Sequence, residues 1–188
     1  MKWFRDLPIA RKLAVAFILT TLMTIALGAF ALLRLSGANA QLGEMSANTI
    51  PSIQHLGEVR AQLGEFRTYE LAQLSMLDQP ERVADYNKRM DASQKIVQDE
   101  MVAYAALPAD DTGRALFKKV QDDVAAYFAA NAKLREASNA GDAVTAQQVS
   151  DEQSRPLRRK LFEDLKEITA YTAKRMQTDL AQANAIHS

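Results

Sequence analysis

The sequence predicts an all-α protein in which an N-terminal transmembrane helix precedes an antiparallel, up-down-up-down four-helix bundle with long first and last helices. Residues 13–33 form a long run without any charged side chain. Short turn signals divide the rest of the chain into helical stretches, and each stretch carries an apolar stripe at alternating spacings of three and four residues. The composition agrees, because seven glycines and five prolines are few for 188 residues.

The run 13–33 predicts the membrane anchor. At about 1.5 Å per residue, it spans about 31 Å, which matches the hydrocarbon core of a bilayer. Basic residues are concentrated in 1–12, whereas Arg34 is the first and only charge in the stretch after the run up to Glu44. The positive-inside rule therefore predicts a cytoplasmic segment 1–12, an inner-membrane helix, and a bundle 34–188 in the periplasm.

A cleaved signal peptide is the alternative interpretation of this run. Ala38-Asn39-Ala40 has the small-residue pattern of a cleavage site. The run is nevertheless longer than the roughly 7–15 residues of a signal sequence, and Arg34 interrupts the approach to the site. The sequence therefore favours an uncleaved anchor.

Turn signals predict where the four bundle helices begin and end. Asp78 is expected to cap a helix whose first turn contains Pro80, Asp and Thr side chains offer a cap in 107–113, and Gly141-Asp142 ends one helix and starts the next. Rough bounds for the helices are 35–78, 81–107, 113–139 and 143–188.

The first and last of these helices are longer than the two between them. The outer pair is therefore expected to extend about 25 Å beyond the inner pair as a two-helix stalk on the membrane side. Pro51 and Pro156 are each expected to kink the helix that contains them, because proline removes one backbone hydrogen bond.

Composition and charge exclude several classes of function. The 23 basic and 23 acidic side chains balance to zero net charge, which argues against a nucleic-acid binder. There is no cysteine, and His55 and His187 are the two histidines, so a metal, cofactor or catalytic site is not expected. His55 has no partner at ligand spacing and is expected at the surface or in the stalk. No nucleophile or phosphate loop indicates an enzyme.

Several short motifs along the chain resemble those of methyl-accepting chemotaxis receptors that have a four-helix-bundle sensor. They are Ala10-Arg11-Lys12-Leu13, Asn48-x-x-Pro51-Ser52, Leu56-x-x-Val59-Arg60, Arg67-x-x-Glu70, Gly141-Asp142 and Arg155-Pro156. The resemblance implies a ligand sensor that forms a homodimer through its first and last helices and signals by small helix sliding. Such receptors continue into a second transmembrane helix, a HAMP module and a cytoplasmic signalling hairpin.

Two other functions remain open at this stage. The bundle is also suited to serve as the input of a histidine kinase or a diguanylate cyclase, because such modules are interchangeable between outputs. A singly anchored structural or partner-binding bundle without a small ligand belongs to a third class. The gene sequence downstream of Ser188 would separate these alternatives.

A polar layer in the otherwise aliphatic seams predicts a ligand site. Counting residues along each helix brings guanidinium, phenol and amide groups to one level of the bundle. The candidate ligand-binding residues are Arg60, Arg67, Tyr127, Asn131, Arg155 and Arg158. Because a guanidinium is a planar fork of donors that matches a carboxylate, the hypothesis is a pocket for a small organic acid or an amino acid.

The same residues also allow an interpretation without a ligand. Arg60 and Arg67 are able to extend from the edge of the seam, with Arg67 paired to Glu70 one turn along. The basic cluster 155–160 is equally compatible with a solvated face. The sequence leaves this choice open.

Overall fold

The computed structural model describes residues 8–44 and 48–187. All regular structure in these ranges is helical, which confirms the predicted all-α class. The chain divides into two compact units, one formed by Met1–Glu44 with Ala181–Ser188 and the other by Met45–Leu180. Each unit is described by itself below.

The first unit contains the long helix α1 (Ile9–Glu44). Within α1, Lys12–Leu33 has a mean hydropathy of 2.3 and no buried side chains, so it is long and apolar enough to cross a membrane. Its threonine hydroxyls bond to backbone carbonyls of the preceding turn, as Thr21 Oγ1 does to Phe17 O at 2.8 Å. The hydroxyls are therefore satisfied without water, which suits a lipid environment.

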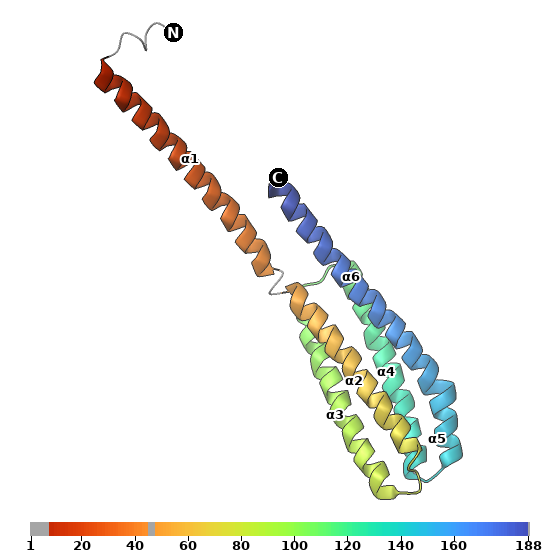
Figure 1. Cartoon of the computed structure of the whole chain (residues 1–188). Helices are drawn as coiled ribbons and strands as arrows, with labels where there is room; N and C mark the ends of the chain where they lie inside the picture. The colour runs from red at the N-terminus through yellow and green to blue at the C-terminus, as the bar shows by residue number, and fades with distance from the viewer. Residues whose placement is uncertain (1–7, 45–47, 188) are drawn as a thin grey trace. The chain divides into compact units, whose positions relative to one another are not determined.

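The second unit is the four-helix bundle. Consecutive long helices run in opposite directions beside one another, which confirms the predicted up-down-up-down order (Figure 1). The elements are α2 (Ile50–Leu74), α3 (Pro80–Ala105), α4 (Asp111–Asn139), α5 (Ala143–Val149), a π-helical turn (Ser150–Ser154) and α6 (Arg155–His187).

The first predicted bundle helix, 35–78, differs from the structure at both ends. Residues 35–44 continue α1, and α2 ends at Leu74 because the chain turns between Ser75 and Gln79. Part of the predicted stalk, Met45–Ala47, lies outside the described residues. The predicted cap Asp78 is wrong: Gln79 occupies the cap position and makes no side-chain cap bond, although Pro80 does open the helix.

Both prolines lie in the first turn of an α-helix. Pro51 lies in the first turn of α2, where a missing N–H leaves no intrahelical bond unmade. Pro156 follows the π-helical turn, in which the Arg155 N–H bonds to Ser150 O, five residues back. Because the proline ring crowds the carbonyl four residues before it, the backbone accommodates Pro156 by widening one turn, and the predicted helix 143–188 is divided there.

The predicted break at 138–142 is confirmed. Gly141 has a φ of 71°, a left-handed conformation that closes α4, and the Asp142 N–H bonds to Ala137 O at 2.9 Å. Asp142 then caps α5 by accepting from the Thr145 N–H at 3.0 Å. Asp110 caps α4 in the same way, accepting from the Gly113 N–H at 2.7 Å.

The predicted apolar stripes form the core, with one shift. Most stripe residues of all four segments are buried, and Tyr104 and Phe117 pack with ring centroids 4.6 Å apart. On α2, however, Val59 and Phe66 fill the core, whereas Arg60 is exposed. The side of α2 that faces the core is therefore the one that carries Val59 and Phe66. Arg67 is the first charged side chain on this side.

Candidate ligand site: a buried arginine layer

A buried ion pair lies on the core face of α2. Glu70 is fully buried and Arg67 is 8% exposed. The Arg67 Nη1 donates to Glu70 Oε1 and also to Ser150 Oγ at 3.1 Å. The guanidinium therefore connects α2 to the π-helical turn before α6.

The second oxygen of Glu70 is bound by α4. Asn131 Nδ2 donates to Glu70 Oε2 at 2.8 Å, and it lies 3.6 Å from Met90 Sδ of α3. Glu70 thus accepts hydrogen bonds from two helices at once. Buried carboxylates require such partners, because an unpaired charge in the core is strongly unfavourable.

Burial raises the pKa of Glu70, because removal from water disfavours the charged carboxylate. The Arg67 charge and the hydrogen bond from Asn131 oppose this shift without cancelling it. The folded protein therefore binds a proton at Glu70 more readily than the unfolded chain does.

This raised pKa predicts a pH dependence of stability. Above the ordinary value of 4.5, the folded state holds a proton that the unfolded state has lost. The free energy of unfolding is therefore expected to fall as the pH rises from 4.5 through the folded pKa of Glu70. Denaturant titrations at a series of pH values measure the free energy of unfolding. Glu70→Gln should remove this component of the slope, and identical slopes in both proteins would contradict the prediction.

Tyr127 of α4 lies in the same layer. Its side chain is fully buried, and its ring packs against Phe66 with centroids 5.6 Å apart. Its hydroxyl has no hydrogen-bond partner among the described residues. Burial and the nearby Glu70 raise the pKa of Tyr127, so the phenol stays neutral as a potential donor.

The remaining predicted arginines differ in their surroundings. Arg158 places its guanidinium over the Phe162 ring, 4.5 Å from the centroid, and its buried Nε has no hydrogen-bond partner among the described residues. Arg60 is exposed and reaches the same ring at 5.9 Å. Arg155 is exposed and pairs with Asp151 at 2.6 Å.

The structure therefore brings four of the six candidate residues together. Arg67 and Asn131 bind Glu70 directly, and the Tyr127 phenol is influenced by the charges of Glu70, Arg67 and Arg158. Arg60 and Arg155 point to the bundle surface instead. We call Arg67, Glu70, Tyr127, Asn131, Ser150, Ser154 and Arg158 the arginine layer.

Sequence reasoning missed some members of this layer. Glu70 was considered only as a partner of Arg67, whereas it is the group on which donors from α2 and α4 converge. Ser150 and Ser154 are buried and were not considered. Their spacing of four residues directly before Arg155-Pro156 is a usable signal, because it places two hydroxyls on one helix face.

His55 lies between α2 and α3. Its Nδ1 lies 2.6 Å from Glu100 Oε2, so it pairs α2 with α3 and is only partly exposed. Among the described residues, no group of three acidic, histidine or cysteine side chains is arranged to hold a metal ion.

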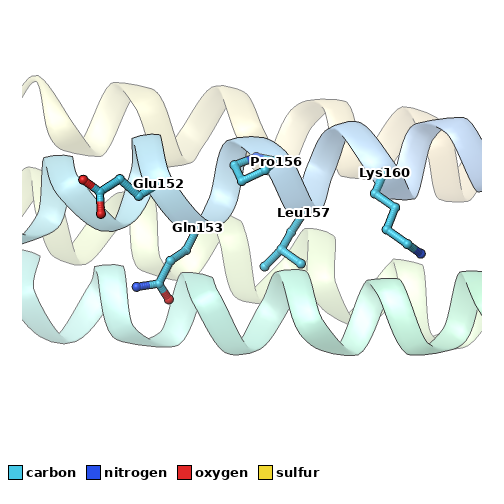
Figure 2. A pocket seen from close by; sticks show the side chains of 5 residues that line it. All are labelled: Glu152, Gln153, Pro156, Leu157 and Lys160. Carbon is cyan, nitrogen blue, oxygen red and sulfur yellow. The ribbon is translucent and has the colours of Figure 1, made fainter.

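Two surface depressions lie near the layer in sequence but are not lined by the predicted residues. One of about 410 Å³ follows the π-helical turn and the start of α6, where Pro156, Leu157 and Lys160 line it with Glu152 and Gln153 (Figure 2). The other, of about 600 Å³, lies between the end of α2 and α5 and includes Leu74, Leu77 and Val144. Both are open to solvent, whereas the arginine layer is closed.

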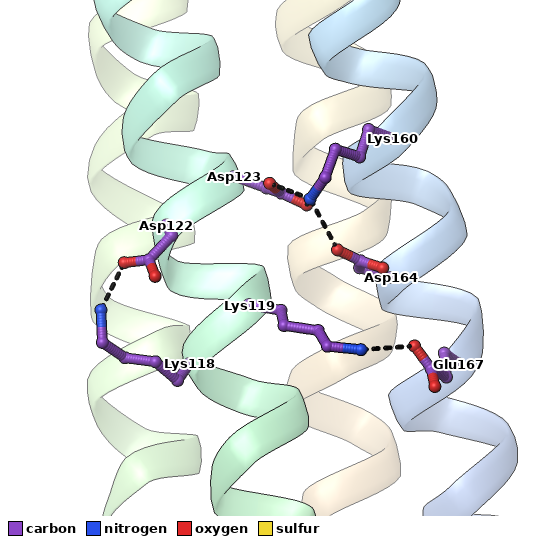
Figure 3. A network of polar contacts seen from close by, with 7 residues as sticks. All are labelled: Lys118, Lys119, Asp122, Asp123, Lys160, Asp164 and Glu167. Atoms are coloured by element: carbon purple, nitrogen blue, oxygen red, sulfur yellow. Dashed lines mark hydrogen bonds and ion pairs between the residues drawn. The ribbon is translucent and has the colours of Figure 1, made fainter.

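A separate polar network joins α4 to α6. Lys160 Nζ donates to Asp123 at 2.5 and 2.7 Å and to Asp164 at 3.0 Å, and Lys119 pairs with Glu167 at 3.3 Å (Figure 3). Burial raises the pKa of Asp123, whereas hydrogen bonding to Asp123 lowers the pKa of Asp164. Lys160 therefore bridges two adjacent carboxyls, and this part of the basic cluster 155–160 contributes to packing between the helices.

Comparison with known families decides the identity of the module. A family described as a four helix bundle sensory module for signal transduction matches residues 6–186. The chain belongs to this family. The sensory module is the one found in methyl-accepting chemotaxis proteins, a non-catalytic signalling domain of membrane receptors, and the apolar helix α1 fits a protein of the inner membrane. No curated protein matches the chain.

Proposed function

We propose that this sensory module is the ligand-sensing part of a transmembrane chemotaxis receptor and that it binds a small carboxylate. Input to a histidine kinase or diguanylate cyclase is the second candidate, because the module itself does not determine the output. The proposed division is a cytoplasmic segment 1–12, a membrane helix 13–33 and a periplasmic sensor 34–188. The proposed assembly is a homodimer through its first and last bundle helices, α2 and α6.

The observation that supports a carboxylate ligand is the chemistry of the arginine layer. Arg67 and Asn131 together donate to both oxygens of one carboxylate, that of Glu70. The same groups are therefore matched to the carboxylate of a ligand, which would replace Glu70 as their acceptor. The unpartnered Tyr127 hydroxyl and Arg158 Nε supply further donors for it.

Orientation in the membrane is testable by itself. A reporter enzyme that is active only outside the cytoplasm, fused after Ser188, is expected to be active, because basic residues precede the run 13–33. The same reporter joined after Lys12 should be inactive. An inactive reporter after Ser188, in a fusion protein that is made and inserted, would contradict the proposed orientation.

Ligand binding is expected to raise the thermal midpoint of the module, because a carboxylate that binds only the folded state stabilises it. Three charge-assisted hydrogen bonds at roughly 1.5–3 kcal/mol each are compatible with a dissociation constant near 1 μM, about −8 kcal/mol, once immobilisation is included. The measurement is a thermal-shift screen of dicarboxylates and amino acids against the full chain.

The control variants distinguish binding at the arginine layer from attraction to the general positive charge of the basic cluster 155–160. The double variant Arg67→Met/Glu70→Leu removes the donor and its resident acceptor together, and it should lose the ligand-induced shift while remaining folded. Arg159→Ala removes an exposed charge next to Arg158 and should keep the shift. Equal loss from both variants would indicate that only the field of the basic cluster matters. A screen without any stabilising carboxylate would contradict the proposed ligand class.

A further inference from the structure

Glu70 makes a hydrogen bond between α2 and α4 that depends on its charge state. It is the only carboxylate among the described side chains with less than 2% exposure. One of its oxygens accepts from Arg67 on its own helix, and the other accepts from Asn131 of α4 at 2.8 Å. The bond to Asn131 therefore joins α2 to α4 through an ionisable group.

Each element packed around Glu70 presents a different set of groups. The charged groups are Arg67 of α2 and Arg158 of α6, the latter acting next to Tyr127. From α4 come the neutral Tyr127 and Asn131, and from the π-helical turn comes Ser154. The described contacts of the layer with α3 run through Met90, which has no charge. Burial favours the neutral acid, and the Arg67 guanidinium favours the carboxylate.

Protonation would change the hydrogen bonds that Glu70 makes. Both oxygens now face donors, whereas a neutral acid carries an O–H that needs an acceptor. The Asn131 Nδ2 cannot accept this hydrogen. Ser154 Oγ and the Tyr127 hydroxyl are buried oxygens without hydrogen-bond partners among the described residues, so the layer contains acceptors for it.

We propose that Glu70 is a proton-binding site inside the sensory bundle, and that protonation weakens its bond to Asn131 and changes how α2 packs against α4. The module would then respond to the acidity of the compartment that holds the bundle, in addition to any carboxylate. The inference does not depend on a carboxylate ligand, because the proton itself is the ligand.

The test measures protonation of Glu70 directly in the full chain, reconstituted in lipid nanodiscs with buffers that contain no carboxylate. Difference infrared spectroscopy during a pH titration follows the C=O stretch of a protonated carboxylic acid. The wild-type chain is expected to show this band with a midpoint above the ordinary glutamate value of 4.5. Glu70→Gln should lose that component and keep the others. A band that survives unchanged in Glu70→Gln would overturn the assignment.

Two further variants test the site even if Glu70→Gln fails to fold. Asn131→Leu removes a donor to the charged form, so the midpoint should rise by roughly one pH unit. Ser138→Ala removes a buried hydroxyl of the same helix that has no hydrogen-bond partner among the described residues, and it should leave the midpoint unchanged. Equal midpoints for Asn131→Leu and the wild type would contradict the proposal.

The conformational part of the proposal needs a distance measurement. The chain has no cysteine, so Ala61→Cys and Ala132→Cys provide unique spin-label sites at exposed positions of α2 and α4. The distance distribution is expected to change across the Glu70 titration in the wild-type background. In Glu70→Gln it should stay in its acid form at every pH. A distance distribution that does not change with pH in the wild type would show that protonation of Glu70 does not change the packing of the helices.

Discussion

Replacing Glu70 with leucine is expected to lower the free energy of unfolding by about 3–5 kcal/mol. The substitution leaves the buried Arg67 guanidinium with Ser150 as its only acceptor among the described residues, and it deprives Asn131 of the carboxylate that it binds. A buried cation without its counter-charge is among the most destabilising arrangements in a protein core. Denaturant unfolding followed by circular dichroism measures the loss.

The double variant Arg67→Met/Glu70→Leu distinguishes this explanation from a simple packing defect. It removes both charges and fills the space with apolar side chains, so it should recover most of the stability that Glu70→Leu loses. Asp99→Ala breaks the exposed pair with Lys95 and should change stability by only about 0.3–0.5 kcal/mol. A double variant as unstable as Glu70→Leu would show that the shape of Glu70, and not its charge, matters.

Phe66→Ala is expected to be the most damaging change in the apolar core, with a loss of about 3–5 kcal/mol. Phe66 is fully buried, and its ring lies 5.6 Å from that of Tyr127 and 5.1 Å from that of Phe128. Truncation removes these contacts and leaves a cavity between α2 and α4. The same unfolding measurement detects it.

A control on the same helix shows whether the loss depends on burial. Leu71 is 47% exposed, so Leu71→Ala should stay within about 0.5 kcal/mol of the wild type. Equal losses at both positions would mean that the face of α2 assigned to the core is wrong.

Much of the fold was predictable because helices depend on local signals. The uncharged run 13–33, the turn at Gly141-Asp142 and the apolar spacing of α3, α4 and α6 are all properties of short windows of sequence. The two exceptions each concern a single residue, but their causes lie in the structure around it. Asp78 does not act as a cap because it lies inside the turn between Ser75 and Gln79, and Pro156 widens a helix turn that the sequence pattern treats as regular.

The arginine layer was only partly predictable. The level at which polar groups interrupt the seams could be counted along the helices, and Arg67, Tyr127 and Asn131 do lie there. Arg60 does not, because neighbouring residues on a helix point about 100° apart and the packing of α2 places Val59, not Arg60, in the core. The spacing of apolar residues alone does not determine the rotation of α2 about its axis closely enough to choose between Val59 and Arg60.

The sequence by itself determined the apolar helix that is long enough to cross a membrane, the order of the bundle helices and the faces that are mainly apolar. These features follow from hydrophobic spacing and turn chemistry within a few residues. Only the tertiary structure decided that the Glu70 carboxylate is the acceptor for both Arg67 and Asn131. Asn131 is 61 residues from Glu70, and Ser150 is 83 residues from Arg67. Whether such groups meet depends on helix rotation, the π-helical turn and side-chain rotamers together, and these are fixed only when the whole core packs.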